Sequence, residues 1–373
     1  MSAPFSAVRS LTPAEQTLAD NGYLLLPAFA EPHAHLDKAF LAERVDNPTG
    51  DLLGAILAME AARDSITVED TIERAERAAR LMASNGCTAI RTHVDLTLAG
   101  GLTSVEALIE VRDRLRGLVE IQVAALCAWP SIGAEGANQR ALVREAIAMG
   151  IDVVGGCPHL ETDPAAANDG LLILAAEAGL PIDLHTDETL NPSMLALEDL
   201  AERVVATGFP HHVAASHCVS LVLQSERRQC EVAEKVAAAG ISVIALPHTN
   251  LFLQGRECQV AMPRAVTAVK ALRAAGVNIA AGADNLQDPF NPMGRGDPLE
   301  TAGLMVITAH VMPADALDMV SVAARTAIGL GPSHDHVAVR AATIREAIAF
   351  GPADRLVVRE VSSLETERSR DRD

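Results

Sequence analysis

The sequence lacks several features that would point to nucleic acids, membranes or disulfides. It carries a formal net charge of −19 and has no cluster of basic residues, so it lacks the positive surface that neutralises phosphate groups. No stretch approaches the roughly 18 consecutive apolar residues that a membrane span requires, and the first ten residues do not form the apolar core of a signal peptide. We therefore expect a cytoplasmic protein that binds neither nucleic acid nor membranes.

The cysteines also lack the spacing of a structural zinc site. No two of them form a Cys-x-x-Cys pair, and most lie among apolar residues. This arrangement is typical of reduced thiols in a core rather than of disulfides or zinc ribbons. The six residues are Cys87, Cys127, Cys157, Cys218, Cys230 and Cys258.

The chain is rich in hydrophobic residues, which make up 49% of its 373 positions, so it can bury a large core. At this length α/β barrels are routinely one domain. No internal repeat, low-complexity tract or linker divides the sequence. We predict a single domain over residues 1–373, with a barrel over about 22–330 and a C-terminal helical extension and tail over 331–373.

Short runs of Val, Ile and Leu alternate with helical stretches rich in Ala, Glu and Arg, which is typical of βα units around a parallel sheet. Several predicted helices end in a glycine directly before the next strand, as a left-handed helix stop requires. Eight such units favour a (β/α)₈ TIM-type barrel over an open doubly wound sheet. The predicted strands are 24–28, 88–93, 120–126, 151–155, 181–185, 212–217, 241–246 and 277–282. After them we expect helices over 298–310, 314–327 and 343–350, a strand-like segment over 354–358 and a frayed charged tail over 365–373.

Four histidines and one aspartate lie where predicted strands end. His33 and His35 follow the first strand, His185 ends the fifth, His217 ends the sixth, and Asp284 follows the eighth. Because the C-terminal ends of barrel strands face one mouth, all five side chains can converge. Imidazole and carboxylate suit Zn²⁺ or Fe²⁺, and three histidines with one aspartate leave a position for water. The pattern predicts a divalent metal site.

Lysine is scarce, and this bears on the number of metal ions. A two-metal barrel of this kind usually bridges its ions with a carbamoylated lysine at the end of the fourth strand. The only lysines are Lys38, Lys235 and Lys270, and none lies near that strand. We therefore expect one metal ion.

These motifs resemble the amidohydrolase superfamily, and within it the cytosine deaminase branch. The resembling segments run in order along nearly the whole barrel: 31–37, 91–95, 153–159, 183–188, 215–217, 250–256 and 282–290. The resemblance implies that a single zinc or iron ion is bound by His33, His35, His185 and Asp284. It also implies that His217 holds the metal's water by hydrogen bonding and that Glu188 transfers protons. A reduced or absent flanking β-sandwich and assembly into a homo-oligomer are further expectations.

The reaction that the resemblance implies is cleavage of a C–N bond in a small aminated heterocycle such as a pyrimidine, triazine or pterin. Metal-activated water would attack the ring carbon that bears the amino group. Glu188 would carry a proton to a ring nitrogen and to the leaving group, so that ammonia or an alkylamine departs.

Departures from cytosine deaminases bear on the substrate. Asn285 stands where those enzymes have a second aspartate, and the segment 126–133 lacks their substrate-binding glutamine. The residue types at Lys38 and Asn285 instead resemble those of isopropylammelide amidohydrolases. Cytosine itself is therefore not the expected substrate. The candidate substrate contacts are Lys38, Trp129, His159, Asn285 and Phe290.

Structural roles remain open for several of these residues. Lys38 could pair with Asp37 or Glu31, His159 could brace a loop, and Trp129 and Phe290 could pack loops. Gln254 and Arg256 are further candidate site residues, either lining the pocket or lying behind the residues that line it. Glu161 could either contact the substrate or brace a loop. His93 ends the second predicted strand and is expected to support the metal ligands.

Two other functions fit the same motifs. The site could hydrolyse a cyclic or linear amide with the same water, or the barrel could bind a ligand or metal without catalysis. Retention of both His217 and Glu188 argues against a silent barrel, because ligand binding needs neither a water-holding residue nor a proton carrier.

Overall fold

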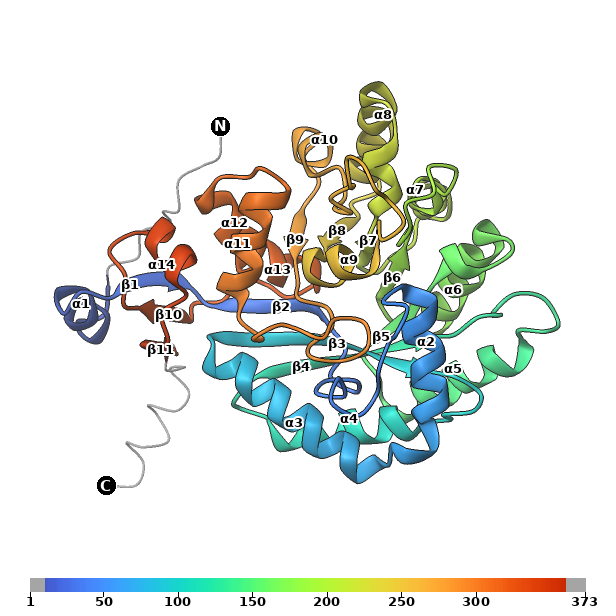
Figure 1. Cartoon of the computed structure of the whole chain (residues 1–373), viewed down its shortest axis with the longest axis horizontal. Coiled ribbons are helices and arrows are strands. Elements are labelled where there is room, and N and C mark those ends of the chain that lie inside the picture. Colours follow the sequence, from blue (N-terminus) through green and yellow to red (C-terminus); the bar gives the residue numbers. More distant parts are fainter. Residues whose placement is uncertain (1–10, 360–373) are drawn as a thin grey trace.

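The computed structural model describes residues 11–359, so the predicted tail over 365–373 and the first ten residues lie outside the described part. Within it, eight parallel strands pair in sequence order (Figure 1). A parallel bridge from Ala34 to Asp284 nearly closes the sheet. The predicted (β/α)₈ barrel is confirmed. Its strands are β2 (Phe29–Ala34), β3 (Cys87–Leu96), β4 (Glu120–Cys127), β5 (Val153–Gly156), β6 (Ile182–Thr186), β7 (Val213–His217), β8 (Ser242–Ala245) and β9 (Ile279–Ala281).

Helices connect successive strands and cover the outside of the barrel (Figure 1). In α3 the cap residue Thr67 accepts the Asp70 N–H, and small side chains at helical spacing are buried. Gly150 and Gly179 end α5 and α6 with φ of 94° and 68°, as the glycine stops predict. These helices are α3 (Val68–Ser84), α4 (Thr103–Arg114), α5 (Ala137–Met149), α6 (Pro164–Ala178), α7 (Ala196–Thr207), α8 (Glu226–Ala238), α9 (Pro247–Leu253) and α10 (Val269–Ala274). Short 3₁₀ turns are η1 (Arg63–Ser65), η2 (Pro158–Leu160) and η3 (Val219–Leu223).

The prediction for the first barrel strand is wrong. Residues Leu24–Pro27 form β1, which pairs antiparallel with β10 (His336–Val339), and β10 pairs in turn with β11 (Arg355–Val358). The barrel begins instead with β2, directly after β1. The chain therefore passes from one sheet to the other at Ala28, without a turn that would mark the change.

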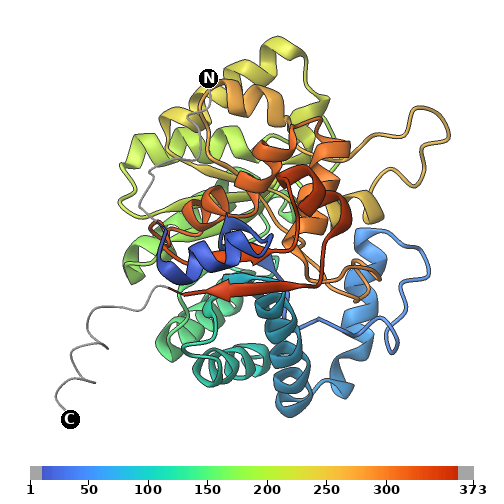
Figure 2. The same ribbon diagram turned by 90° about the vertical axis from the view of Figure 1, so that its left-hand side faces the viewer.

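The sheet of β1, β10 and β11 lies beside α1 (Pro13–Asp20) and α14 (Ile344–Phe350), at one side of the barrel (Figures 1 and 2). In the described chain it has three strands, so the expected flanking sheet is reduced rather than absent. The predicted extension after residue 330 thus contains strands as well as a helix. The helix predicted over 314–327 is two helices, α12 (Pro313–Met319) and α13 (Val322–Ala327), which follow α11 (Pro298–Thr308).

Small side chains fill the barrel interior away from the site. Ala89, Ala214 and Ala280 lie in one buried cluster with residues of α13, including Ala324 and Ala327. Helix α13 packs on β2, β8 and β9 and so covers that end of the barrel. No helix within residues 11–359 is both long and apolar enough to span a bilayer.

Candidate metal centre and active site

The predicted ligands converge at the C-terminal ends of the barrel strands. His33 lies in β2 and His35 follows it, while His185 lies in β6. The Nε2 atom of His185 lies 3.2 Å from Nε2 of His33 and 3.2 Å from Nε2 of His35. Asp284 Oδ1 lies 3.2 Å from His35 Nε2 and 3.7 Å from His33 Nε2. Four residues from three separate parts of the chain therefore present ligand atoms to one point.

The donor atoms of this cluster fit a divalent cation. Burial lowers the pKa of His33, His35 and His185 well below 6.5, so these rings are neutral and offer lone pairs. Burial raises the pKa of Asp284, so a carboxylate there needs a positive charge beside it. Neither buried oxygen of the Asp284 carboxylate has a hydrogen-bond partner among the described residues. One cation would satisfy these oxygens and separate the facing nitrogens, and a set of three nitrogens and one oxygen suits zinc or iron.

A buried chain of hydrogen bonds orients His33 from behind. Its Nδ1 lies 2.8 Å from Ser216 Oγ, and Ser216 donates to Asp183 Oδ1 at 2.9 Å. Burial alone would raise the pKa of Asp183, but His93 and Arg91 hold it far below its usual range. The ionised Asp183 thus attracts the Ser216 hydroxyl hydrogen, so the Ser216 oxygen accepts from His33 Nδ1–H. His33 Nε2 is then free to bind a metal, as the tautomer requires.

His93 lies in the position expected for a supporting residue. Its ring stacks on His33 with centroids 4.0 Å apart, and its Nε2 lies 3.5 Å from Asp183 Oδ2. It also forms part of a second group of closely spaced donors, with His33 and Asp183. Because Asp183 is already paired with Arg91 at 2.9 Å, this second group belongs to the scaffold behind the ligands.

Glu31 braces the closure of the barrel, a role that the sequence analysis did not assign. Its Oε1 atom accepts the N–H groups of His33 at 3.2 Å and Ala283 at 3.1 Å, so it ties β2 to the segment that carries Asp284. A Cβ atom at Gly282 would lie 2.4 Å from Glu31 Oε1, which leaves room for glycine alone. An acidic residue within the apolar strand two positions before His33 was the available signal.

His217 and Glu188 lie beside the ligands. The Nδ1–H of His217 donates to Asn250 Oδ1 at 2.9 Å, which leaves Nε2 as an acceptor 3.9 Å from Asp284 Oδ2. Burial lowers the pKa of His217 to about 4. Burial and the neighbouring Asp284 raise the pKa of Glu188 well above its usual range, and its Oε1 lies 3.6 Å from His217 Nδ1. The pair thus offers a neutral acceptor and a carboxyl group able to hold a proton.

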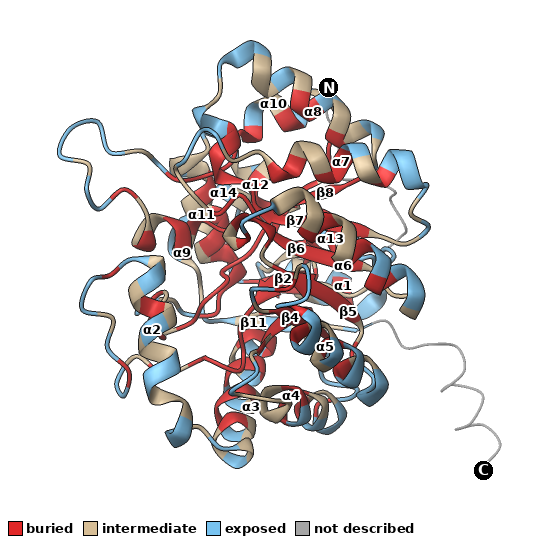
Figure 3. Ribbon diagram, turned by 90° about the vertical axis from the view of Figure 1, so that its right-hand side faces the viewer, coloured by how far each residue is buried: buried red, intermediate tan, exposed pale blue. Residues whose placement is uncertain are grey.

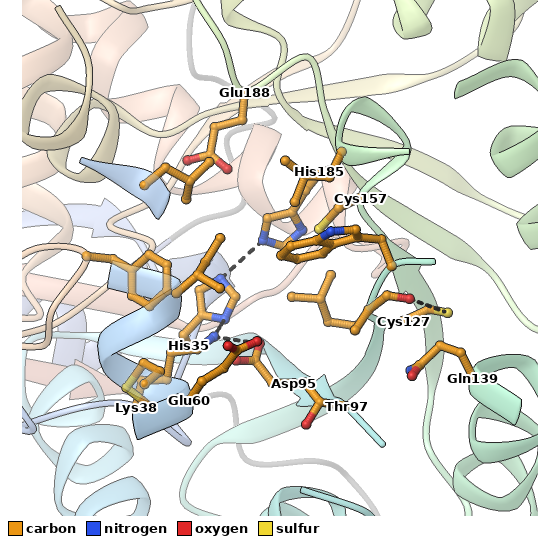
Figure 4. Close-up of a pocket in the computed structure, with 18 of the residues that line it drawn as sticks. His35, Lys38, Glu60, Asp95, Thr97, Cys127, Gln139, Cys157, His185 and Glu188 are labelled. Carbon is orange, nitrogen blue, oxygen red and sulfur yellow. Dashed lines mark hydrogen bonds and ion pairs between the residues drawn. The ribbon is translucent and has the colours of Figure 1, made fainter. Parts of the chain in front are cut away.

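A cavity of about 400 Å³ opens onto this centre (Figure 4). At the centre it is lined by His35, His185, His217, Asp284 and Glu188. Four of the five predicted substrate contacts also line it: Lys38, Trp129, Asn285 and Phe290. The fifth, His159, is not brought to the wall, because its Nδ1 donates to the backbone carbonyl of His185 at 2.9 Å and holds the ring behind it.

Lys38 is fixed between the centre and the cavity wall (Figure 4). Its Nζ lies 2.9 Å from His35 Nδ1 and 2.7 Å from Asp95 Oδ1, and 5.3 Å from the centre of the Phe290 ring. Although burial opposes it, the charge of Asp95 contributes most to raising the pKa of Lys38. The ion pair that the structure places here is therefore with Asp95, a residue to which the sequence analysis gave no role.

Part of the wall comes from a segment that the sequence analysis missed. Helix α2 (Leu52–Ala62) lies between β2 and α3 and contributes Leu52, Ile56 and Met59 to the lining. Asp51 caps it by accepting the Gly54 N–H at 2.7 Å, which was a readable start signal. Arg256 stacks on Phe252 at 4.4 Å, and neither Arg256 nor Gln254 is part of this lining. Glu161 accepts the N–H and hydroxyl of Ser131 and so braces a loop.

Comparison with known proteins gives close relatives over nearly the whole chain. The chain is 34% identical to a pterin deaminase from Rhizobium rhizogenes over 362 residues, which cover 93% of this chain and 82% of the relative. Its structure superposes on 5-methylcytosine deaminase from Klebsiella pneumoniae liganded with 5-fluorocytosine with a TM-score of 0.83 and 30% identity, covering 96% and 91% of the two chains. It superposes on N-isopropylammelide isopropylaminohydrolase from Burkholderia multivorans with a TM-score of 0.76 and 31% identity, covering 91% and 86%.

The model of the amidohydrolase family matches residues 39–334. This match and the named relatives confirm the resemblance that the sequence motifs indicate, including its deaminase branch. The chain therefore belongs to the amidohydrolase family.

Proposed function

We propose that this protein is a hydrolase that uses one divalent metal ion to release ammonia or an alkylamine from a small aminated nitrogen heterocycle. The observation that carries the proposal is the convergence of four ligand atoms with Glu188 and His217 at the end of one cavity. The ligands would be His33, His35, His185 and Asp284. Relatives named as pterin, 5-methylcytosine and isopropylammelide enzymes support the substrate class.

The residues around the ligands have distinct roles in this proposal. A divalent cation supplies Lewis acidity, which brings the pKa of water to about 7. His217 Nε2 accepts a hydrogen bond from the attacking water and fixes its direction. Glu188 would take one proton from that water and pass it to a ring nitrogen. It would then take the second proton from the hydroxyl group now on the ring carbon and pass it to the leaving amine, as the C–N bond breaks and a carbonyl forms. Lys38 and Asn285 hold polar atoms of the ring in the cavity.

The proposed activity is tested by combining metal analysis with product detection. We expect one zinc or iron ion per chain, and release of ammonia or alkylamine from at least one member of a panel of pterins, aminopyrimidines and aminotriazines. Removal of the metal with a chelator should abolish the release, and addition of Zn²⁺ or Fe²⁺ should restore it. Metal-loaded protein that releases no amine from any ring, but opens a cyclic amide or acts on nothing, would contradict the proposal.

Ser216→Ala should weaken metal binding without removing any proposed ligand. The change deletes the hydroxyl between His33 and Asp183, so His33 loses the partner that fixes its tautomer. Loss of such a supporting contact typically lowers metal affinity about 10-fold to 100-fold. Competition with a chromogenic chelator measures that affinity directly, without a substrate.

Ser242→Ala is the matched control for Ser216→Ala. Ser242 is also a buried serine on a barrel strand, but its hydroxyl accepts from Asn278 at 3.1 Å, away from the ligands. If both variants lower the unfolding temperature equally while only Ser216→Ala loses metal affinity, the effect belongs to the site. Unchanged affinity in Ser216→Ala would refute the orienting role of Ser216.

A further inference from the structure

Helix α2 presents a row of apolar side chains to the cavity. Leu52, Ile56 and Met59 follow one another at spacings of four and three residues, so they share one face, and all three line the cavity. Leu53 and Leu57, on other faces of the helix, are 60% and 53% exposed. Figure 3 shows α2 at the edge of the molecule, away from the buried strands of the barrel.

The pocket-facing side chains of α2 are not covered by the protein core. Of its residues only Ala55 is buried, and Leu52, Ile56 and Met59 remain half-buried at the cavity. Concave apolar surface of this kind is what ligand pockets use to bind apolar groups, because removing it from water is favourable. The half-buried apolar face at the cavity therefore fits a part of the ligand rather than core packing.

The remaining apolar wall extends this surface. Leu98 follows β3, Trp129 follows β4, and Leu160 lies in η2, and all three line the same cavity. Trp129, the only tryptophan of the chain, is 39% exposed. Polar groups that could pair with ring nitrogens or oxygens lie beside the ligands: Lys38, Asp95, Glu188 and Asn285. The end of α2 and the turn after it add Glu60 and Arg63 to the lining, so the apolar surface of α2 is the row of Leu52, Ile56 and Met59. Figure 4 shows Glu188 on one side of His35, and Glu60 of α2 on the other side with Lys38 and Asp95.

We infer that the substrate is an aminated heterocycle that carries an apolar substituent, and that this substituent packs against Leu52, Ile56 and Met59 of α2. The inference rests on the proposed function for the ring and adds a second part to the substrate. A bare polar ring would engage the polar groups beside the ligands but would leave the α2 face in contact with water. The α2 face is therefore a specificity determinant that is separate from the groups that carry out the reaction.

The test compares rings that differ only by an alkyl chain. The probes are pterin with 6-propylpterin and cytosine with 5-propylcytosine, and the corresponding deaminated rings serve as ligands for calorimetry. We expect at least one propyl compound to show about 10-fold higher kcat/KM than its parent, and its deaminated form to bind about 10-fold more tightly, as one well-packed apolar group typically gives. Ile56→Ala should reduce both ratios several-fold.

Leu57→Ala is the matched control, since it removes a branched apolar side chain from the adjacent position that faces away from the cavity. The ratios in this variant should equal those of the wild type. Equal affinity for the propyl and parent rings, or equal effects of Ile56→Ala and Leu57→Ala, would overturn the inference. If the parent rings still release ammonia in that case, the proposed function stands. Tighter binding of the propyl rings without amine release from any compound would uphold the α2 site and refute the proposed function.

Discussion

Glu188→Gln should lower turnover about 10²-fold or more while one metal ion per chain is retained, as expected when a general acid–base group is lost. Glu188 is buried beside Asp284 and lies outside the proposed ligand set, and its raised pKa lets it hold a proton in the cavity. Glutamine keeps the size of the side chain and its capacity for hydrogen bonds but cannot gain or release a proton at neutral pH. Turnover and metal content measured on the same preparation separate the two effects.

Glu135→Gln is the control, because it makes the same chemical change at an exposed residue of the cavity lining. We expect it to keep the turnover of the wild type. If Glu188→Gln is as active as the wild type, the proton-transfer role is lost. If the variant fails to bind metal, Glu188 is needed to hold the ion and belongs with the proposed ligands rather than with the proton-transfer groups alone.

The barrel and its proposed ligands could be predicted because their signals are local. A histidine or aspartate at the end of an apolar run can be placed at a strand end from the sequence alone. Barrel topology then brings the strand ends together. His185, His217 and Asp284 all lie where this reasoning places them. The prediction of the first strand is wrong because residues 24–30 form one apolar run that contains β1 and the start of β2, and these two strands belong to different sheets. The pairing of Leu24 with Val339, more than 300 positions away in the sequence, leaves no local trace.

The wall of the cavity and the support of the ligands were harder to predict, for a different reason. Helix α2 is apolar on more than one face, so it lacks the polar–apolar alternation by which a surface helix is recognised. Ser216 and Asp183 are ordinary residues in strands until the fold places them behind His33. Their roles arise from contacts between strands that no single segment encodes.

His217→Asn should lower turnover about 10²-fold or more, as Glu188→Gln does, and should leave the metal bound. The amide of the replacement can still donate to Asn250 Oδ1, as His217 Nδ1–H does at 2.9 Å. It cannot reproduce Nε2, the acceptor that faces Asp284. The variant therefore removes the group proposed to hold the water and little else.

His185→Asn is the informative comparison, because the same substitution at a proposed ligand should remove the metal as well as the activity. The comparison is needed because donor atoms of His33, His185 and His217 also lie within 4.8 Å of one another, so geometry alone permits a ligand set that contains His217. Distances favour Asp284, whose Oδ1 lies 3.2 Å from His35 Nε2, whereas His217 Nε2 lies 3.9 Å from the other oxygen of that carboxylate. Metal content by mass spectrometry decides between the two sets. Equal loss of metal in both variants would make His217 a ligand and would require another residue to orient the water.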